Sequence, residues 1–280
     1  MSTFKSFALI GATGNIGKYI LNAFRAIDIH PLVVTRKTSN SAVPSGLTVA
    51  KVDLDNVDEV SQTLQQHGIE VVISTVTAFA LESQQRLADA AKRAGVKLFV
   101  PSEFALPAED TSGLSGNFAW VFEQKKKFVD YLESIGLPWV RFHTGLFTSF
   151  VPWLGAVGEN GKFNVEKGKG HYEITVTDDE DVAGFLVHVL TTLPPKDLEN
   201  RPFRISGEDV SLETLGKRIN KEVEFVDTIP GSGAQFRTTL LALVYTGQGV
   251  TSWDSATKAK KRGPQATDNH IWAGHEWKKL

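Results

Sequence analysis

Short runs of apolar residues alternate with stretches of helical periodicity along the first half of the chain. Hydrophobic side chains recur at three- and four-residue spacing over 16–27, as on one face of a helix. Two further helices, over 81–94 and 117–135, are expected to end at Gly95 and Gly136, because glycine readily adopts the left-handed conformation that stops a helix. The apolar runs that predict buried strands are 7–10, 32–34, 47–52, 71–73, 97–100 and 139–142. Strands that alternate with helices through short joins predict an α/β fold, a doubly wound parallel sheet of the Rossmann type.

The second half of the chain has a less regular pattern, with fewer clear elements. A capping box that begins at Thr177 predicts a helix reaching about Leu193, and Ser211 is a candidate cap for a helix reaching Lys221. The other expected elements are strands at 172–176, 203–205 and 223–226 and a helix at 236–245. We expect this half to fold as a smaller lobe.

The boundary between the two parts is placed where the regular alternation stops. We expect a dinucleotide-binding domain over 1–145 and a substrate lobe over 146–280, with part of the chain returning to the first sheet. The segment 248–280 is polar and basic. Its candidate anchors are Trp253, Trp272 and Trp277.

Composition and charge exclude several classes of protein. Hydrophobic residues make up 41% of the chain and charged residues 22%, as in a globular protein. The net charge of −2 favours neither nucleic acid nor an anionic membrane as a partner. No apolar run approaches the roughly 18 residues of a membrane span. Because there is no cysteine, disulfides and thiolate chemistry are excluded. We expect a cytoplasmic protein without a metal site, and the sequence leaves open whether it is a monomer or a homodimer.

A glycine-rich segment, GATGNIG over 11–17, follows the first predicted strand and opens the first predicted helix. Gly11 suits the tight turn, Gly14 lets the backbone approach a pyrophosphate, and Gly17 lets the helix pack on the strand. The helix N-terminus adds partial positive charge, although the segment could also be an ordinary strand–helix joint. The cofactor candidates in this segment are Gly11, Thr13, Gly14, Asn15, Ile16 and Gly17.

The end of the second predicted strand decides between the two nicotinamide dinucleotides. An NAD site usually has an acidic residue about 20 residues after the glycine loop, but here Arg36 and Lys37 occupy that neighbourhood. A basic pair suits the 2′-phosphate of NADP(H), or it is simply a solvated turn. Asp53, after the third strand, could meet the adenine, and its surroundings are equally typical of a helix start.

One lysine lies on the apolar stripe of the helix predicted over 117–135. Lys125 falls three residues after Phe122 and four before Val129, whereas Lys126 and Lys127 point elsewhere. Such a lysine either extends to the surface along its apolar stem or is half-buried beside a ligand that tunes its pKa. No tyrosine precedes any lysine by four residues, so the tyrosine–lysine mechanism of short-chain dehydrogenases is absent.

Four segments together resemble one known family. The glycine loop, Arg36-Lys37, the FVPSEF segment over 99–104 and the VFEQK segment over 121–125 are similar in order and spacing to the NmrA-like, isoflavone-reductase-like branch of atypical short-chain dehydrogenases. Members are NADPH-dependent reductases of phenolic ethers or nucleotide-binding regulators. The resemblance implies that NADPH/NADP+ is the cofactor, held by the glycine loop with Arg36 and Lys37, and that Lys125 is catalytic.

Ligands of parallel sheets bind beyond the carboxyl ends of the strands, which supplies the remaining site candidates. The further cofactor candidates are Thr75, Thr77, Ser102, Glu103 and Phe104. The substrate candidates are Phe79, His143, Phe147, Phe150 and Trp153. Of these, His143 is either a second proton donor or a hydrogen-bonded structural histidine.

These candidates together predict an enzyme. We expect an NADPH-dependent oxidoreductase that reduces a small aromatic or phenolic organic substrate, with Lys125 transferring the proton. The alternative is a non-catalytic NmrA-like regulator that senses NADP(H) and binds a protein partner. Lys125 on the core stripe favours the enzyme, because a sensor needs no acid or base there.

Overall fold

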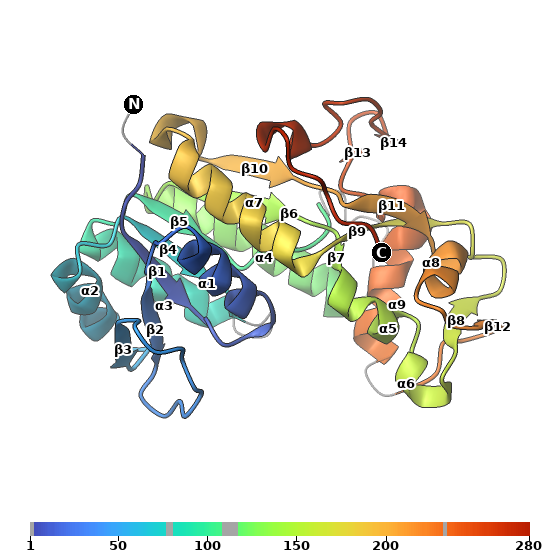
Figure 1. The fold of residues 1–280 in the computed structure, drawn as a ribbon, viewed down its shortest axis with the longest axis horizontal. Helices are drawn as coiled ribbons and strands as arrows, with labels where there is room; N and C mark the ends of the chain where they lie inside the picture. The colour runs from blue at the N-terminus through green and yellow to red at the C-terminus, as the bar shows by residue number, and fades with distance from the viewer. Residues whose placement is uncertain (1–2, 77–80, 108–116, 232–233) are drawn as a thin grey trace. The chain divides into compact units, whose positions relative to one another are not determined.

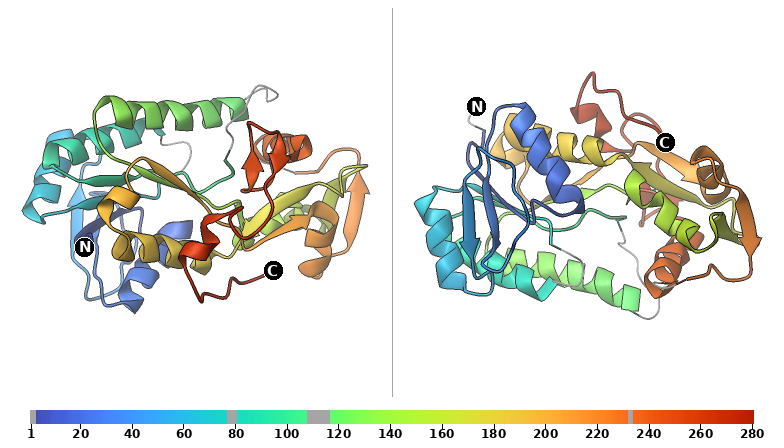
Figure 2. Two further views of the ribbon diagram at one scale, coloured as in Figure 1. Left: turned by 90° about the horizontal axis from the view of Figure 1, so that it is seen from above. Right: turned by 60° about the horizontal axis from the view of Figure 1, so that its bottom comes forward.

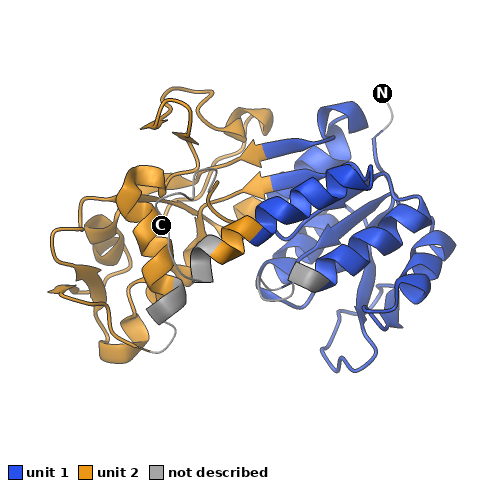
Figure 3. Ribbon diagram, turned by 180° about the vertical axis from the view of Figure 1, so that it is seen from behind, with its two compact units in different colours: residues 1–103, 124–141, 183–202 blue, residues 104–123, 142–182, 203–280 orange. Residues whose placement is uncertain are grey.

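The computed structural model describes residues 3–76, 81–107, 117–231 and 234–280. The chain forms two compact units, each assembled from three separate segments (Figure 3). Unit 1 consists of residues 1–103, 124–141 and 183–202, and unit 2 of residues 104–123, 142–182 and 203–280.

Unit 1 is built on a five-stranded parallel sheet (Figure 1). Its strands are β1 (Phe7–Ile10), β2 (Leu32–Arg36), β3 (Val49–Val52), β4 (Val71–Ser74) and β5 (Leu98–Val100). Their order in the sheet is β3-β2-β1-β4-β5, and every neighbouring pair is parallel. From β1 the chain adds β2 and β3 on one side of the sheet and then β4 and β5 on the other. This change of side at β1 confirms the predicted doubly wound α/β fold.

Helices cover both faces of this sheet, as the left view in Figure 2 shows. The helices α1 (Asn15–Ala26) and α7 (Asp179–Thr192) lie on one face, and α3 (Leu81–Ala94) and α4 (Asn117–Ser134) lie on the other. On the first face Phe7 packs against Phe24, with ring centroids 4.8 Å apart. On the second, Val34 and Val72 belong to one buried cluster with residues of α2 (Val57–Gln66), α3 and α4. Residues that alternate along each strand therefore fill two separate cores.

For the three helices predicted in the first half of the chain, the ends agree with the structure in two cases and differ in one. Gly95 follows α3 with φ +78°, and Gly136 follows α4 with φ +63°, so both glycines terminate helices as expected. Ile27 does not belong to the buried face of the first helix. The helix ends at Ala26, the chain turns at Asp28, and the Ile27 side chain is 50% exposed.

The sixth predicted strand does not extend the main sheet as a regular neighbour. Strand β6 (Val140–His143) pairs with β10 (Arg201–Arg204). Its connection to β5 is an isolated parallel bridge between Phe99 and Trp139. The local pattern predicted the strand, but its partner comes from 60 residues later in the chain.

Unit 2 is a mixed lobe of short strands and helices around one buried apolar cluster. One sheet has the order β11-β9-β7, and two further pairs are β12-β8 and β13-β14. Its strands are β7 (Leu146–Phe147), β8 (Phe163–Glu166), β9 (Glu173–Thr177), β11 (Glu208–Ser211), β12 (Val223–Val226), β13 (Trp253–Asp254) and β14 (Ala259–Lys260). Its helices are α5 (Val151–Leu154), α6 (Val157–Asn160), α8 (Leu212–Arg218) and α9 (Ala234–Leu243). The described residues also form the 3-10 turns η2 (Thr148–Phe150), η3 (Pro195–Asp197) and η5 (Asp268–Ile271) and the π-helical segment η4 (Val244–Gln248).

The two predicted caps in this half have different outcomes. Ser211 caps α8, because its hydroxyl accepts the backbone N–H of Thr214 at 3.3 Å. Thr177 does not cap α7. It lies in β9 and donates its hydroxyl to the carbonyl of Thr144 at 2.7 Å, while the side chain of Asp178 accepts the N–H of Glu180.

The end of the chain is held to unit 2 by a buried carboxylate. Asp181, 2% exposed, accepts hydrogen bonds from Nε2 of His275 at 3.0 Å and from the backbone N–H of Lys278 at 2.6 Å. The ring of His275 stacks on Trp272 and meets Trp277 edge-on. These two tryptophans therefore serve as packing anchors of the basic tail. Within the described parts of the chain, no helix has the length and apolarity to span a membrane.

Candidate functional site

The glycine turn between β1 and α1 is held by close contacts that two of its glycines allow. Gly11 has φ +86°, and a Cβ on it would lie 2.5 Å from Oγ1 of Thr75. A Cβ on Gly17 would lie 2.1 Å from the carbonyl oxygen of Gly11. Gly14 differs, because it has no positive φ and its Cβ would meet only that same oxygen, at 3.2 Å. Packing within the protein thus explains Gly11 and Gly17 but does not require glycine at position 14.

The N-terminus of α1 has the electrostatic properties of an anion site. Gly14 occupies the N-cap position, no side chain caps the helix, and the first turn contains no acidic residue. Thr13, Gly14 and Asn15 are exposed, whereas the Ile16 side chain is buried in the core. The first N–H groups of this 12-residue helix therefore face outward with the positive end of the helix dipole.

Two hydroxyls tie together the carboxyl ends of the neighbouring strands. Thr75 donates to the carbonyl of Ile10 at 2.8 Å, and Ser102 donates to the carbonyl of Val76 at 2.7 Å. The N–H of Ser102 donates to Oε1 of Gln84 at 2.9 Å. The hydroxyl protons are engaged within the protein, so both groups can only accept hydrogen bonds from a ligand.

Gln84 was missed by the sequence analysis. It is 1% exposed and lies on α3. The signal that could have found it is a polar side chain on the buried side of an otherwise amphipathic helix. Two other candidates, Thr77 and Phe79, fall outside the described residues.

The two basic residues at the end of β2 have different surroundings. Lys37 forms an ion pair with Glu59, with 2.8 Å between Nζ and Oε2. The hydrogen bond from Lys37 holds the pKa of the Glu59 carboxyl below its usual value. Arg36 is exposed, and no acidic residue in the described ranges pairs with it. Asp53 is exposed and its carboxylate accepts the N–H of Asp55 at 3.1 Å, just before Asn56 caps α2. Of the two basic residues, Arg36 is therefore the more available to a ligand.

Lys125 lies on the buried side of α4. It is 9% exposed, close to the values for Phe122 and Val129, whereas Lys126 and Lys127 are exposed. Among the described residues no carboxylate approaches its ammonium within the 4.0 Å of an ion pair. Burying a charge is costly unless a partner of opposite charge compensates for it, and no ion-pair partner compensates for the burial of Lys125 in the described structure.

A buried carboxyl and a partly buried arginine accompany this lysine. Glu103, in the segment that follows β5, is 5% exposed, and burial raises its pKa above the ordinary value of 4.5. The charges of Lys125 and Arg141 oppose that rise, which means that both lie within electrostatic reach of the carboxyl. Nε of Arg141 is buried without a hydrogen-bond partner in the described structure, and its guanidinium stacks over the ring of Trp139. Arg141 was not a candidate from the sequence, although an arginine inside an apolar strand was a usable signal.

The remaining candidates belong to unit 2. The ring of Phe104 stacks on Phe142 with 6.4 Å between centroids. His143, 4% exposed, lies at the end of β6, where its carbonyl accepts the N–H of Ile205 at 2.9 Å. The other three form an aromatic row. Phe147, Phe150 and Trp153 follow one another with centroid distances of 6.2 and 6.4 Å.

A buried arginine supports this row. Arg237 on α9 is 3% exposed and lies over the ring of Trp153 at 5.3 Å. It donates to the carbonyls of Trp153 and Pro230, each at 2.8 Å. Burial lowers the pKa of its guanidinium, and Glu159 opposes that change. Arg237 was not a candidate from the sequence.

Comparison with known proteins identifies the family. The model of the NmrA-like family matches residues 3–234. The chain belongs to the NmrA-like family. This assignment confirms the resemblance found in the glycine loop and in the FVPSEF and VFEQK segments.

The curated proteins to which the chain is similar include oxidoreductases. The chain is 39% identical over 145 residues to the oxidoreductase aprR of Aspergillus flavus, a match that covers 50% of this chain and 48% of that protein. It therefore spans about half the length of that relative. It is 30% identical over 212 residues to the oxidoreductase BOA1 of Botryotinia fuckeliana, covering 70% and 69% of the two chains.

Among solved structures, the fold is similar to a binary complex of leucoanthocyanidin reductase and NADPH from Vitis vinifera. The TM-score is 0.76 at 18% identity, and the alignment covers 98% of this chain and 96% of that one. At this identity the likeness establishes the fold alone, in agreement with the five-stranded parallel sheet of unit 1.

Proposed function

We propose that the protein is an NADP(H)-dependent oxidoreductase that reduces a small aromatic or phenolic organic molecule. The observation that carries the proposal is Lys125, a buried lysine on α4 without an ion-pair partner in the described structure. It lies within electrostatic reach of Glu103, in the segment after strand β5 of the parallel sheet. The similarity of the chain to curated oxidoreductases supports the same activity.

The residues of unit 1 fit a dinucleotide. The outward N–H groups at the start of α1 suit a pyrophosphate, and Gly14 leaves open the space that a side chain would fill. Arg36 presents a planar fork of donors suited to a 2′-phosphate, and Lys37 can assist if it leaves Glu59. The end of β2 itself presents Arg36 and Lys37 and not an acidic residue, and these donors favour NADP(H) as the cofactor.

Lys125 is assigned to proton transfer. When bound, NADPH supplies a hydride to an electrophilic carbon of the substrate. The ammonium of Lys125 then provides the balancing proton to a substrate oxygen. Glu103 and Arg141 act on this group electrostatically, and the burial of Lys125 and Glu103 limits competition from water.

The aromatic preference is assigned to the row formed by Phe147, Phe150 and Trp153 in unit 2. Neighbouring rings of the row are tilted or edge-on to each other, and Arg237 holds Trp153 through its carbonyl and its ring. A row of this kind favours a flat, unsaturated substrate. His143 is kept as a second candidate for proton donation.

The decisive experiment is a substrate screen that follows NADPH oxidation with the full-length protein. The panel contains phenolic ethers, enones, quinones and aldehydes, and each compound is tested with NADPH and NADH. Turnover of at least one aromatic compound with NADPH is expected. If the protein binds NADPH but reduces nothing in the panel, the enzyme proposal fails and the NADP(H)-sensing regulator takes its place.

A further inference from the structure

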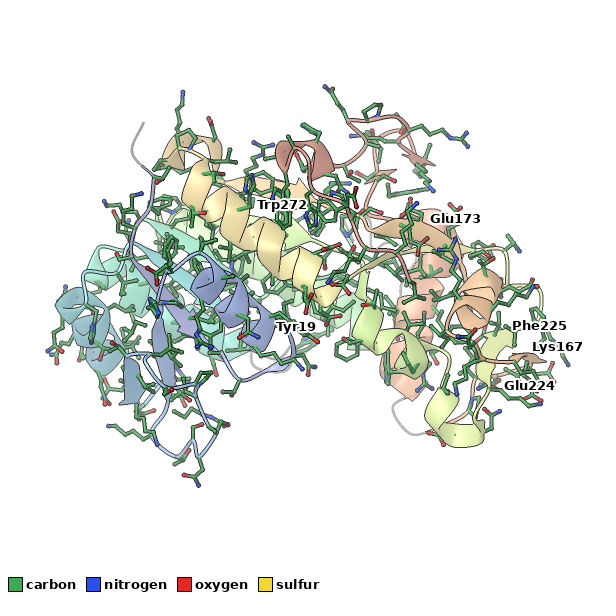
Figure 4. The ribbon with its side chains drawn as sticks, in the orientation of Figure 1. Tyr19, Lys167, Glu173, Glu224, Phe225 and Trp272 are labelled. Carbon is green, nitrogen blue, oxygen red and sulfur yellow. The ribbon has the colours of Figure 1, made fainter. Side chains whose placement is uncertain are left out.

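A cavity in unit 2 lies among residues that the proposed reductase does not use. Its volume is about 520 Å³, which is within the usual range of small-molecule sites. Its walls come from β9, the segment before β11, the hairpin β13–β14 and the segment that follows that hairpin. The lining residues are Glu173, Ser206, Asp209, Ser252, Lys260, Lys261, Arg262, Gly263, Ala266 and Thr267. Figure 4 labels Glu173 on β9.

The acidic groups of this cavity are already engaged. Nζ of Lys260 lies 2.8 Å from Glu173 and 2.9 Å from Asp209. The carboxylate of Asp209 also accepts hydrogen bonds from the hydroxyls of Thr175 and Ser206. The acceptors on the walls are thus satisfied within the protein, and they offer little to a cationic ligand.

The basic side chains and the Thr267 hydroxyl of the cavity have fewer partners within the protein than its acidic groups. Arg262 is exposed, and no acidic residue in the described structure pairs with it. Lys261 is 54% exposed and reaches Asp254 only at 3.4 Å. The hydroxyl of Thr267 has no partner in the described ranges, where the backbone oxygen of Thr267 contacts His270. The lining therefore has unused donors and positive charge, the complement of an anion.

A buried hydroxyl supplies a second, independent observation. Ser252 is 3% exposed, and its Oγ lacks a hydrogen-bond partner in the part of the chain that is described. Leaving a buried polar group unsatisfied costs about 1–3 kcal/mol, and a ligand that accepts from this hydroxyl would remove that cost. A hydrogen bond fixes the backbone beside it, since the carbonyl of Ser252 accepts the N–H of Lys261 at 2.9 Å.

We propose that this cavity binds a small organic anion that carries a phosphate or carboxylate group, with Arg262 and Ser252 among its donors. The guanidinium pairs with two oxygens of the anion in the bidentate manner, and the Ser252 hydroxyl donates to the same group. Lys261 contributes charge from the rim. The site belongs to unit 2 and does not depend on the dinucleotide that unit 1 is proposed to bind.

The test measures anion binding by calorimetry and thermal shift on the full-length protein. Pyrophosphate and citrate serve as the two probes, which separate a phosphate ligand from a carboxylate ligand. Arg262→Ala is expected to weaken the preferred probe about tenfold, the effect of losing one charge-assisted contact. Lys258→Ala removes a positive charge from the same hairpin outside the cavity and should leave the affinity almost unchanged.

Ser252→Ala separates binding from folding. Because the hydroxyl has no partner, its removal should leave the Tm without anion unchanged or higher, while the shift produced by the anion decreases. A lower Tm with unchanged anion binding would mean that the hydroxyl has a structural role, and would overturn its assignment as a ligand donor.

The glycine turn of unit 1 is a second place where phosphate can bind, so the experiment includes Gly14→Val. If Gly14→Val abolishes pyrophosphate binding and Arg262→Ala does not, the anion site in unit 2 is refuted and the dinucleotide site stands. If Arg262→Ala removes a binding component that Gly14→Val retains, the new site is supported whatever the outcome for NADPH.

Discussion

The ammonium of Lys37 lies 2.8 Å from Oε2 of Glu59, at the start of the second helix. Both residues are at the surface, and the Glu59 carboxylate also accepts the N–H of Asp53 at 3.3 Å. A lysine proposed to meet the 2′-phosphate of NADP(H) is thus already engaged by a carboxylate. Exposed pairs of this kind are weak, so a dianionic phosphate can compete for the lysine, at some cost in affinity.

Releasing Lys37 should strengthen NADPH binding. Glu59→Gln removes the competing charge and is expected to increase affinity for NADPH a few-fold while affinity for NADH stays constant. Titration by intrinsic fluorescence measures both constants. Asp58→Asn is the control, because it removes a negative charge from the same helix at a residue that pairs with Arg93 instead. Equal effects of the two variants would attribute the change to net charge.

Arg36 should contribute more to cofactor choice than Lys37. In the wild-type protein NADPH should bind at least tenfold more tightly than NADH, since each charge-assisted contact contributes about 1.5–3 kcal/mol. Arg36→Asp should erode this preference more than Lys37→Ala, because the new carboxylate also repels the phosphate. Equal affinities for the two dinucleotides in the wild-type protein would contradict the assignment of the basic pair.

Gly14→Val tests the glycine turn itself. The built Cβ meets only the Gly11 oxygen, at 3.2 Å, so the variant should fold with at most a small loss of Tm. Its side chain occupies the space proposed for the pyrophosphate, and both NADPH and NADH should bind at least tenfold more weakly. Gly158→Val is matched, because a Cβ there meets nothing within 4 Å. Unchanged binding in a folded Gly14→Val protein would reduce the turn to a structural joint.

Lys125→Met should separate proton transfer from cofactor binding. Methionine keeps the apolar stem of the side chain and removes a buried charge, so stability should be retained or increased. The turnover number should fall roughly 10²–10⁴-fold, while the Kd of NADPH changes little. Lys126→Met, at an exposed position one residue further along α4, should be nearly silent. Small and equal effects at both positions would move proton transfer to His143 or to water.

The buried carboxyl of Glu103 predicts a particular dependence of stability on pH. Burial raises its pKa in the folded protein above 4.5, so the folded state holds this proton more tightly than the unfolded state. The stability from this group is present below pH of about 4.5 and is lost as the pH rises through the raised pKa. Glu103→Gln should remove that loss. Urea unfolding of both proteins across the acidic and neutral range measures it, and parallel curves would show that Glu103 titrates normally.

The positions of the elements in unit 1 could be predicted because the signals are local. Buried strands of a parallel sheet are continuous apolar runs, and each amphipathic helix repeats its apolar positions every three to four residues. Strand β1 over Phe7–Ile10 and helix α3 over Leu81–Ala94 have the predicted bounds, and Gly95 ends that helix. The connection rules for βαβ units then determine a parallel sheet.

Elements whose boundaries depend on distant contacts were less predictable. Thr177 has the sequence of a helix cap, but pairing of β9 with β7 and β11 draws it into a strand, where it donates to Thr144. Ile27 also fits the periodicity of the first helix, yet the helix ends one residue earlier, where the N–H groups of Asp28 and Ile29 bond back to the carbonyls of Arg25 and Phe24. At Thr177 the pairing of strands overrides the local pattern, whereas at Ile27 a local turn with positive φ at Asp28 ends the helix.

The sequence by itself determined the family, the parallel sheet, the glycine turn and the place of Lys125 on the core side of its helix, because each depends on spacing along a short segment. Only the tertiary structure decided which charges meet. It paired Lys37 with Glu59, and it brought Glu103 within reach of Lys125 and Arg141. These residues come from different strands and helices, and their distances are set by how the elements pack, which no local pattern contains.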